Sequence, residues 1–210
     1  LARAADLFRP VHDLTGGLAG WVSLEVSPLL ANDRAGTIAA AANLHRRAAR
    51  PNLLIKIPGT PAGLPAIEES IFSGVPVNVT LLFSAAHYLA AADAYMRGLE
   101  RRVAAGLDSE IGSVASIFVS RWDVAVADRV PAAIRNQLGI AIARRTYQAY
   151  REVLASPRWG PRAAAGARTP GLLCATQGTQ DAGATTPPYG GALRDPPPLT
   201  TPRERTPHAP

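Results

Sequence analysis

Short runs of β-forming apolar residues alternate with longer alanine-rich stretches along most of this 210-residue chain. Five of the runs have the length and composition of strands, because aliphatic and aromatic residues dominate them and turn residues bound them. These predicted strands cover residues 21–26, 53–57, 75–80, 113–119 and 171–175. The chain is therefore expected to alternate between strand and helix.

In the stretches between these strands, the apolar residues have the spacing of one face of a helix. Helices are expected at 35–50, 64–72, 122–127 and 139–154, and a longer one, capped by Ser84, is expected to run to residue 102. Asn32 or Asp33 is suited to cap the first, since a short polar side chain accepts hydrogen bonds from free backbone N–H groups. Pro76 is expected at the entrance of the third strand, because proline cannot donate within a sheet.

Near-continuous apolar strands separated by helices are typical of a parallel sheet whose outer face is covered. No GxGxxG motif follows any predicted strand. The even spacing favours a βα barrel over a doubly wound sheet. We therefore predict an α/β fold, a (βα)8 TIM-type barrel of which this chain holds about five to six βα units.

Composition narrows the class of protein. No stretch reaches the roughly 18 apolar residues of a membrane span, and no signal-peptide pattern opens the chain, which also lacks an initiating Met. We expect a cytoplasmic protein whose sequence begins within a longer one. The net charge is +6, but the arginines are scattered, so no nucleic-acid partner is expected. The single cysteine, Cys174, has apolar neighbours and is expected to be a small buried residue rather than a reactive thiol.

Lys56 is the only lysine among the 22 Lys and Arg residues, and it lies between Ile55 and Ile57 in a predicted strand. One interpretation is a strand-end lysine whose ammonium group reaches water. The other is a nucleophile, because an amine, unlike a guanidinium, readily loses its proton and attacks a carbonyl to form a Schiff base.

Other polar residues also fall at or near the carboxyl ends of predicted strands. Glu25, Asn78 with Thr80, and Ser116 occupy such positions in three strands besides that of Lys56. Each alone is compatible with an ordinary turn residue or exposed carboxylate. In βα barrels this end of the sheet holds the active site, so the set predicts one around Lys56.

The residues around Lys56 resemble the Schiff-base signature of the transaldolase family. Residues 53–64 read Leu-Leu-Ile-Lys-Ile-Pro-Gly-Thr-Pro-Ala-Gly-Leu, which places apolar residues around the lysine and Pro, Gly and Thr after it. Residues 22–28, 77–84 and 115–121 resemble further family segments in the same order. The resemblance covers residues 1–181 and implies a partial TIM-type barrel over that range. A change in composition then marks a separate tail at 182–210.

The resemblance implies transfer of a dihydroxyacetone unit between sugar phosphates in the pentose phosphate pathway, with no metal or organic cofactor. The donor would be sedoheptulose 7-phosphate or fructose 6-phosphate, and the acceptor glyceraldehyde 3-phosphate or erythrose 4-phosphate. Lys56 would form the imine with the donor carbonyl. Glu25 and Thr80 would hold the water through which protons move.

The resemblance also implies substrate-binding residues. Asn78 and Ser116 would hydrogen-bond hydroxyl groups of the dihydroxyacetone unit, and Arg121 would bind the substrate phosphate. Taken from the residues alone, Arg121 is instead a helix-start arginine paired with Asp123 or Asp128.

The sequence departs from the family pattern at both ends. It contains neither the first-strand Asp nor the second-strand Thr-Ser-Asn-Pro segment, and Gln180 stands where a basic phosphate-binding residue is expected. Residues 182–210 are rich in Pro, Thr and Arg and are expected to be disordered or extended. They are interpreted as a linker, a PxxP-type ligand or a frameshifted segment replacing the last barrel unit.

An incomplete barrel leaves two open sheet edges, so poor solubility, aggregation or a homo-oligomer is expected. Two other functions stay open from the sequence. One is a truncated product that keeps the lysine without a working site. The other is a different Schiff-base aldolase, such as a fructose 6-phosphate aldolase or a deoxyribose phosphate aldolase.

Overall fold

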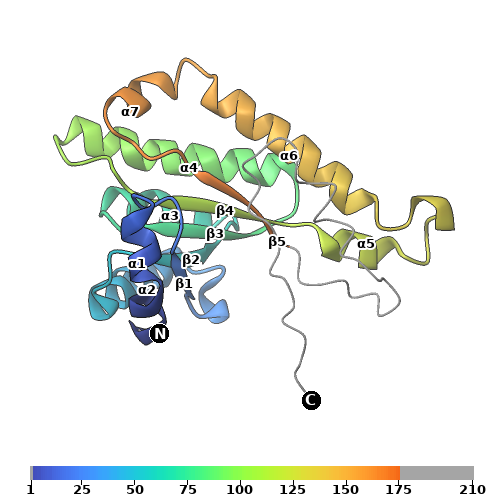
Figure 1. The fold of residues 1–210 in the computed structure, drawn as a ribbon, viewed down its shortest axis with the longest axis horizontal. Helices are drawn as coiled ribbons and strands as arrows, with labels where there is room; N and C mark the ends of the chain where they lie inside the picture. Colours follow the sequence, from blue (N-terminus) through green and yellow to red (C-terminus); the bar gives the residue numbers. More distant parts are fainter. Residues whose placement is uncertain (1, 176–210) are drawn as a thin grey trace.

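A parallel sheet of five strands forms the centre of the computed structural model, which describes residues 2–175 (Figure 1). The strands lie in chain order from β1 to β5, and each is hydrogen-bonded to the next. Their bounds are Val22–Glu25 (β1), Leu53–Pro58 (β2), Val77–Leu82 (β3), Ser113–Phe118 (β4) and Gly171–Ala175 (β5).

Helices connect the strands and pack against one another in chain order. Helices α2, α3, α4 and α6 form a continuous layer, and Figure 1 shows α4 and α6 running side by side. The bounds are Ala2–Leu14 (α1), Arg34–Ala48 (α2), Gly63–Phe72 (α3), Ala85–Ala104 (α4), Ser120–Val126 (α5), Leu138–Leu154 (α6) and Gly160–Ala164 (α7), with 3-10 turns at Pro28–Leu30 and Ala132–Ile134.

The strand order confirms the predicted fold class. Each new strand is added at the same edge of the sheet, so right-handed crossovers place the connecting helices on one face. A doubly wound sheet would reverse its strand order and carry helices on both faces. Among the described strands β1 and β5 form the two edges, as in a barrel that is only partly present. The expectations for Gln180 and for the tail at 182–210 lie outside the described residues.

Local capping explains where two of the helices begin. Asp33 Oδ1 accepts a hydrogen bond from the N–H of Gly36 at 2.9 Å, which selects Asp33 over Asn32 as the cap of α2. Ser84 caps α4 as predicted, accepting from the N–H of His87 at 3.1 Å. Both side chains bind donors that the first turn of a helix leaves unpaired.

Helix α1 was not predicted from the sequence, and it lies at the amino end of the sheet. Asn52, the residue before β2, donates from Nδ2 to the carbonyl oxygens of Ala5 and Gly20 at 2.8 and 3.0 Å. Arg50 pairs with Asp6 across the same boundary at 2.5 Å. None of the described helices combines the length and apolar character needed to cross a bilayer.

Alternation along β2 separates the core from the candidate site. Leu53, Ile55 and Ile57 are fully buried and belong to the same apolar cluster as Ile71 of α3. Successive side chains of a strand point to opposite faces. Lys56 therefore points away from the helices, toward the opposite face of the sheet.

Ion pairs join α4 to Arg158, just before α7, and to Arg162 within α7. Arg158 contacts Glu100 at 2.8 Å and Asp93 at 2.5 Å, and Arg162 also pairs with Glu100. The hydrogen bond from Arg158 lowers the pKa of Glu100 below its usual value. Because a lowered carboxyl pKa favours the folded state only while the group is ionised, stability should fall as the pH drops below about 4.

Urea unfolding of Glu100→Gln at neutral and acidic pH tests this. At pH 7 the free energy of unfolding of the variant should be lower by about 1 kcal/mol or less, since these ion pairs are partly exposed. Its free energy of unfolding should also change less with pH than that of the unaltered protein. Glu152→Gln is the control, because exposed Glu152 forms no ion pair within residues 2–175 and accepts a hydrogen bond from Gln148. Equal pH dependence in all three proteins would contradict the prediction.

Candidate active site

Strand register places three of the predicted site residues side by side. Glu25 of β1 pairs with Lys56 of β2, which pairs with Asn78 of β3. The amine Nζ of Lys56 lies 3.3 Å from Oε2 of Glu25. The Lys56 side chain is 27% exposed and that of Glu25 47%, so substrate and water can reach both groups. A single amine thus lies beside a carboxylate at the open face of the sheet.

Three side chains form a hydrogen-bonded relay beside this pair. Ser116 of β4 donates from Oγ to Oδ1 of Asn78 at 2.7 Å, and Asn78 donates from Nδ2 to Oγ of Ser23 at 3.0 Å. Asn78 and Ser116 are buried, whereas Ser23 is exposed. Sequence reasoning gave no role to Ser23. The signal was its position two residues before Glu25, which places both side chains on one face of β1.

Thr80 lies next to an irregularity in β3. Val79 pairs with Ala115 and Leu82 with Ile117, so β3 has one more residue than β4 between these two pairs, and Leu81 adopts a positive φ of 59°. Such bulges redirect side chains and are common next to active sites. The hydroxyl of Thr80 is buried and has no hydrogen-bond partner within residues 2–175. A buried hydroxyl without a partner is unusual in a folded protein, which makes Thr80 a candidate for binding a polar group.

Arg121 occupies a different environment from the one its sequence neighbours suggested. Its guanidinium lies over the ring of Phe118, 4.6 Å from the ring centroid, and it forms no ion pair with Asp123 or Asp128. Asp123 instead accepts hydrogen bonds from the backbone N–H of Gly139 at 3.2 Å. The predicted carboxylate pairing of Arg121 is therefore wrong, because α5 directs Asp123 toward the start of α6.

Direct contacts and strand register connect four of the six predicted site residues. Glu25 contacts Lys56, Lys56 is paired in register with Asn78, and Asn78 bonds to Ser116. Thr80 and Arg121 lie at the carboxyl ends of β3 and β4 and, within the described part of the chain, make no hydrogen bond or ion pair with the other four.

Cys174 is a structural residue, as expected. It lies in β5, is 3% exposed, and burial raises the pKa of its thiol to about 12. Because the thiolate is the nucleophilic form, burial and the raised pKa disfavour a nucleophilic role at neutral pH.

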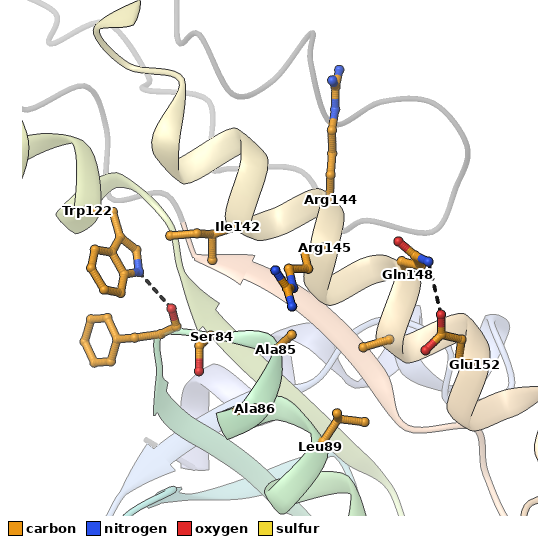
Figure 2. A pocket seen from close by; sticks show the side chains of 12 residues that line it. Ser84, Ala85, Ala86, Leu89, Trp122, Ile142, Arg144, Arg145, Gln148 and Glu152 are labelled. Atoms are coloured by element: carbon orange, nitrogen blue, oxygen red, sulfur yellow. Dashed lines mark hydrogen bonds between the residues drawn. The ribbon is translucent and has the colours of Figure 1, made fainter. Parts of the chain in front are cut away.

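A separate groove of about 970 Å³ lies between the start of α4 and α6 (Figure 2). Arg144 and Arg145 both line the groove, and Figure 2 shows Arg145 directed toward the start of α4 while Arg144 extends in the opposite direction. The indole of Trp122 donates to the carbonyl oxygen of Phe83 at 2.8 Å, and the Phe83 ring stacks on that of Phe118 with centroids 5.4 Å apart. None of the six predicted site residues lines this groove, so it is distinct from the site around Lys56.

Comparison with known proteins assigns the family. Residues 1–178 match the model of the family described as transaldolase/fructose-6-phosphate aldolase. The chain belongs to the transaldolase/fructose-6-phosphate aldolase family. It is 49% identical to transaldolase 1 of Streptomyces avermitilis over 186 residues, which cover 85% of this chain and 49% of that protein.

Other transaldolases give similar values. The chain is 48% identical to the transaldolase of Thermobifida fusca, covering 85% of this chain and 50% of that protein. It is 40% identical to transaldolase 2 of a Nostoc species, covering 86% of this chain and 52% of that protein. This member of the transaldolase/fructose-6-phosphate aldolase family thus spans about half the length of the curated relatives it matches.

Proposed function

We propose that this chain carries the Schiff-base part of a transaldolase active site. The reaction would move a dihydroxyacetone unit from sedoheptulose 7-phosphate or fructose 6-phosphate to an aldose phosphate, as in the pentose phosphate pathway. The observation that carries the proposal is the Lys56 amine 3.3 Å from the Glu25 carboxylate on the polar face of the sheet. Membership of the family supports it.

Lys56 would act as the nucleophile. Its amine adds to the C2 carbonyl of the ketose, and loss of water gives an imine. The C4 hydroxyl gives up its proton to the Glu25 carboxylate through the water held there, the C3–C4 bond breaks, and its electron pair moves into the protonated imine. The aldehyde leaves, and the enamine that stays on Lys56 adds to the carbonyl of the acceptor aldose.

Glu25 and Thr80 would manage protons during imine formation. A carboxylate next to the amine accepts the proton that the ammonium must lose and returns one to the departing water. The free hydroxyl of buried Thr80 would hold that water by a hydrogen bond. Neither role requires a metal ion.

Asn78, Ser116 and Arg121 would bind the substrate. Asn78 and Ser116 are buried beside Lys56 and already share a hydrogen bond, which orients both toward one small polar group. Arg121 has its guanidinium stacked on Phe118 and pairs with no carboxylate within the described residues. Its fork of N–H donors suits the phosphate of the sugar.

A second candidate is a protein that forms the imine without completing the transfer. The sequence contains no Thr-Ser-Asn-Pro segment, and the chain spans about half of the relatives it matches. In this case Lys56 would bind ketose phosphates covalently and reversibly, but the C3–C4 bond would stay intact.

Borohydride trapping with fructose 6-phosphate, followed by peptide mass spectrometry, separates the candidates. Because Lys56 is the only lysine, the terminal amine is the one competing primary amine. We expect a reduced three-carbon adduct on Lys56, which requires cleavage of the C3–C4 bond. The urea-unfolded protein is the control and should give no adduct.

The size of the adduct decides the outcome. A six-carbon adduct alone would favour the imine-forming protein over the transaldolase. Folded protein without any adduct on Lys56 would contradict both candidates.

A further inference from the structure

Ser23 occupies an unusual place in the relay. The bond between Asn78 and Ser23 joins β3 to β1, although β2 lies between them. Neighbouring strands are about 4.8 Å apart, so the backbones of β1 and β3 are separated by roughly 10 Å. Two short side chains close that distance only by leaning toward each other over the face of β2.

The register shows where this bond crosses. Ser23 pairs with Leu54, whereas Asn78 pairs with Lys56. The bond therefore runs diagonally over β2, between the side chains of Leu54 and Lys56. The Asn78–Ser23 bond therefore closes one side of the space around the Lys56 amine. This side faces the amino ends of the strands, where Leu54 is buried.

The relay fixes which hydrogen-bonding groups remain for a ligand. Ser116 uses its one proton to bind Oδ1 of Asn78, so Ser116 Oγ can only accept a further bond. Asn78 uses one of its two Nδ2 protons for Ser23, so one N–H is left. One donor beside one acceptor matches a hydroxyl group, which both accepts and donates.

We propose that Ser23 is a positioning residue that holds the Asn78 carboxamide so that Asn78 and Ser116 together bind one substrate hydroxyl beside Lys56. Ser116 fixes only the oxygen end of the carboxamide. Within the described residues, Ser23 is the partner that fixes the nitrogen end. Without Ser23 the carboxamide can rotate and lose its alignment with the hydroxyl. This role rests on the proposed function, because it assigns the ligand of that site.

The unliganded protein gives the first test. Ser23→Ala should shift the side-chain amide signals of Asn78 in a 1H–15N NMR spectrum, since one Nδ2 proton loses its acceptor. Ser23→Thr keeps a hydroxyl and should restore signals close to the original. Ser73→Ala removes an exposed hydroxyl just after α3 and should leave them unchanged. Asn78 signals that do not respond to Ser23→Ala would overturn the proposal.

Trapping gives the second test. We expect Ser23→Ala to raise the fructose 6-phosphate concentration for half-maximal trapping about tenfold, the effect of losing one aligned hydrogen bond. The amount trapped at saturation should be unchanged, and Ser23→Thr should behave like the unaltered protein. An unchanged half-maximal concentration, or a loss confined to the amount trapped at saturation, would overturn the proposed role.

The two tests keep this proposal apart from the proposed function. If the unaltered protein forms no adduct, the proposed function fails, and the substrate hydroxyl assigned here fails with it. The NMR comparison would still show whether Ser23 positions Asn78.

Discussion

Lys56→Arg is expected to abolish the borohydride-trapped adduct while the protein stays folded. Arginine keeps the positive charge 3.3 Å from Glu25 and suits a partly exposed position, so the ion pair can form again. A guanidinium remains protonated at neutral pH and cannot form the imine. Peptide mass spectrometry after trapping with fructose 6-phosphate measures the adduct, and circular dichroism checks the fold.

A matched variant separates the nucleophile from its proton-transfer partner. Glu25→Gln keeps Lys56, so the adduct should still form, but about 100-fold more slowly, because the carboxylate no longer moves protons. Loss of the adduct in Lys56→Arg with slow formation in Glu25→Gln supports the assigned roles. An adduct of undiminished amount in Lys56→Arg would show that another amine reacts.

The sequence predicted well those features that depend on neighbouring residues. An apolar run closed by Pro58 and Gly59 located β2, whose observed bounds are Leu53–Pro58. Ser84 was identified as a cap and Asp33 as one of two candidates, since a capping side chain binds an N–H only three residues away. Short-range hydrogen bonds and strand-forming runs can be predicted from the order of residues alone.

Features that depend on distant partners were missed. Helix α1 contains Pro10, and Asn52, far along the chain, bonds to it. The role of Ser23 depends on a bond across an intervening strand, and the bulge beyond Val79 depends on the register with β4. Local spacing places Ser23 on the same face as Glu25, but it does not show which distant residue Ser23 binds.

Arg121 shows why charge pairing is hard to predict from spacing. Asp123 is only two residues away, but residues two apart on a helix do not face each other. Gly139 then provides Asp123 with backbone N–H bonds, while Phe118 provides Arg121 with an aromatic surface. The alternative that pairs Arg121 with Asp123 or Asp128 is therefore not found, and phosphate binding by Arg121 stays a prediction.

Ile71→Ala is expected to lower the free energy of unfolding by about 3 kcal/mol or more, within the range for isoleucine truncation in a core. Ile71 of α3 is fully buried and faces α4 at Gly98. A Cβ atom at Gly98 would lie only 2.7 Å from Cβ and Cγ2 of Ile71, so the two helices already pack as closely as glycine allows. Glycine has no side chain that can move into the space left by Ile71. Urea unfolding measures the loss.

Val103→Ala is the control, because Val103 lies on the same helix α4 and is 46% exposed. Val103→Ala should change the free energy of unfolding by no more than about 0.5 kcal/mol, as surface substitutions generally do. Since a domain is stable by only about 5 to 15 kcal/mol, the loss in Ile71→Ala is a large fraction of the total. If both variants lost the same small amount, α3 and α4 would not pack at Gly98 as described. Because Ile71 shares its core with Ile55 and Ile57, that contact also supports the strand that carries Lys56.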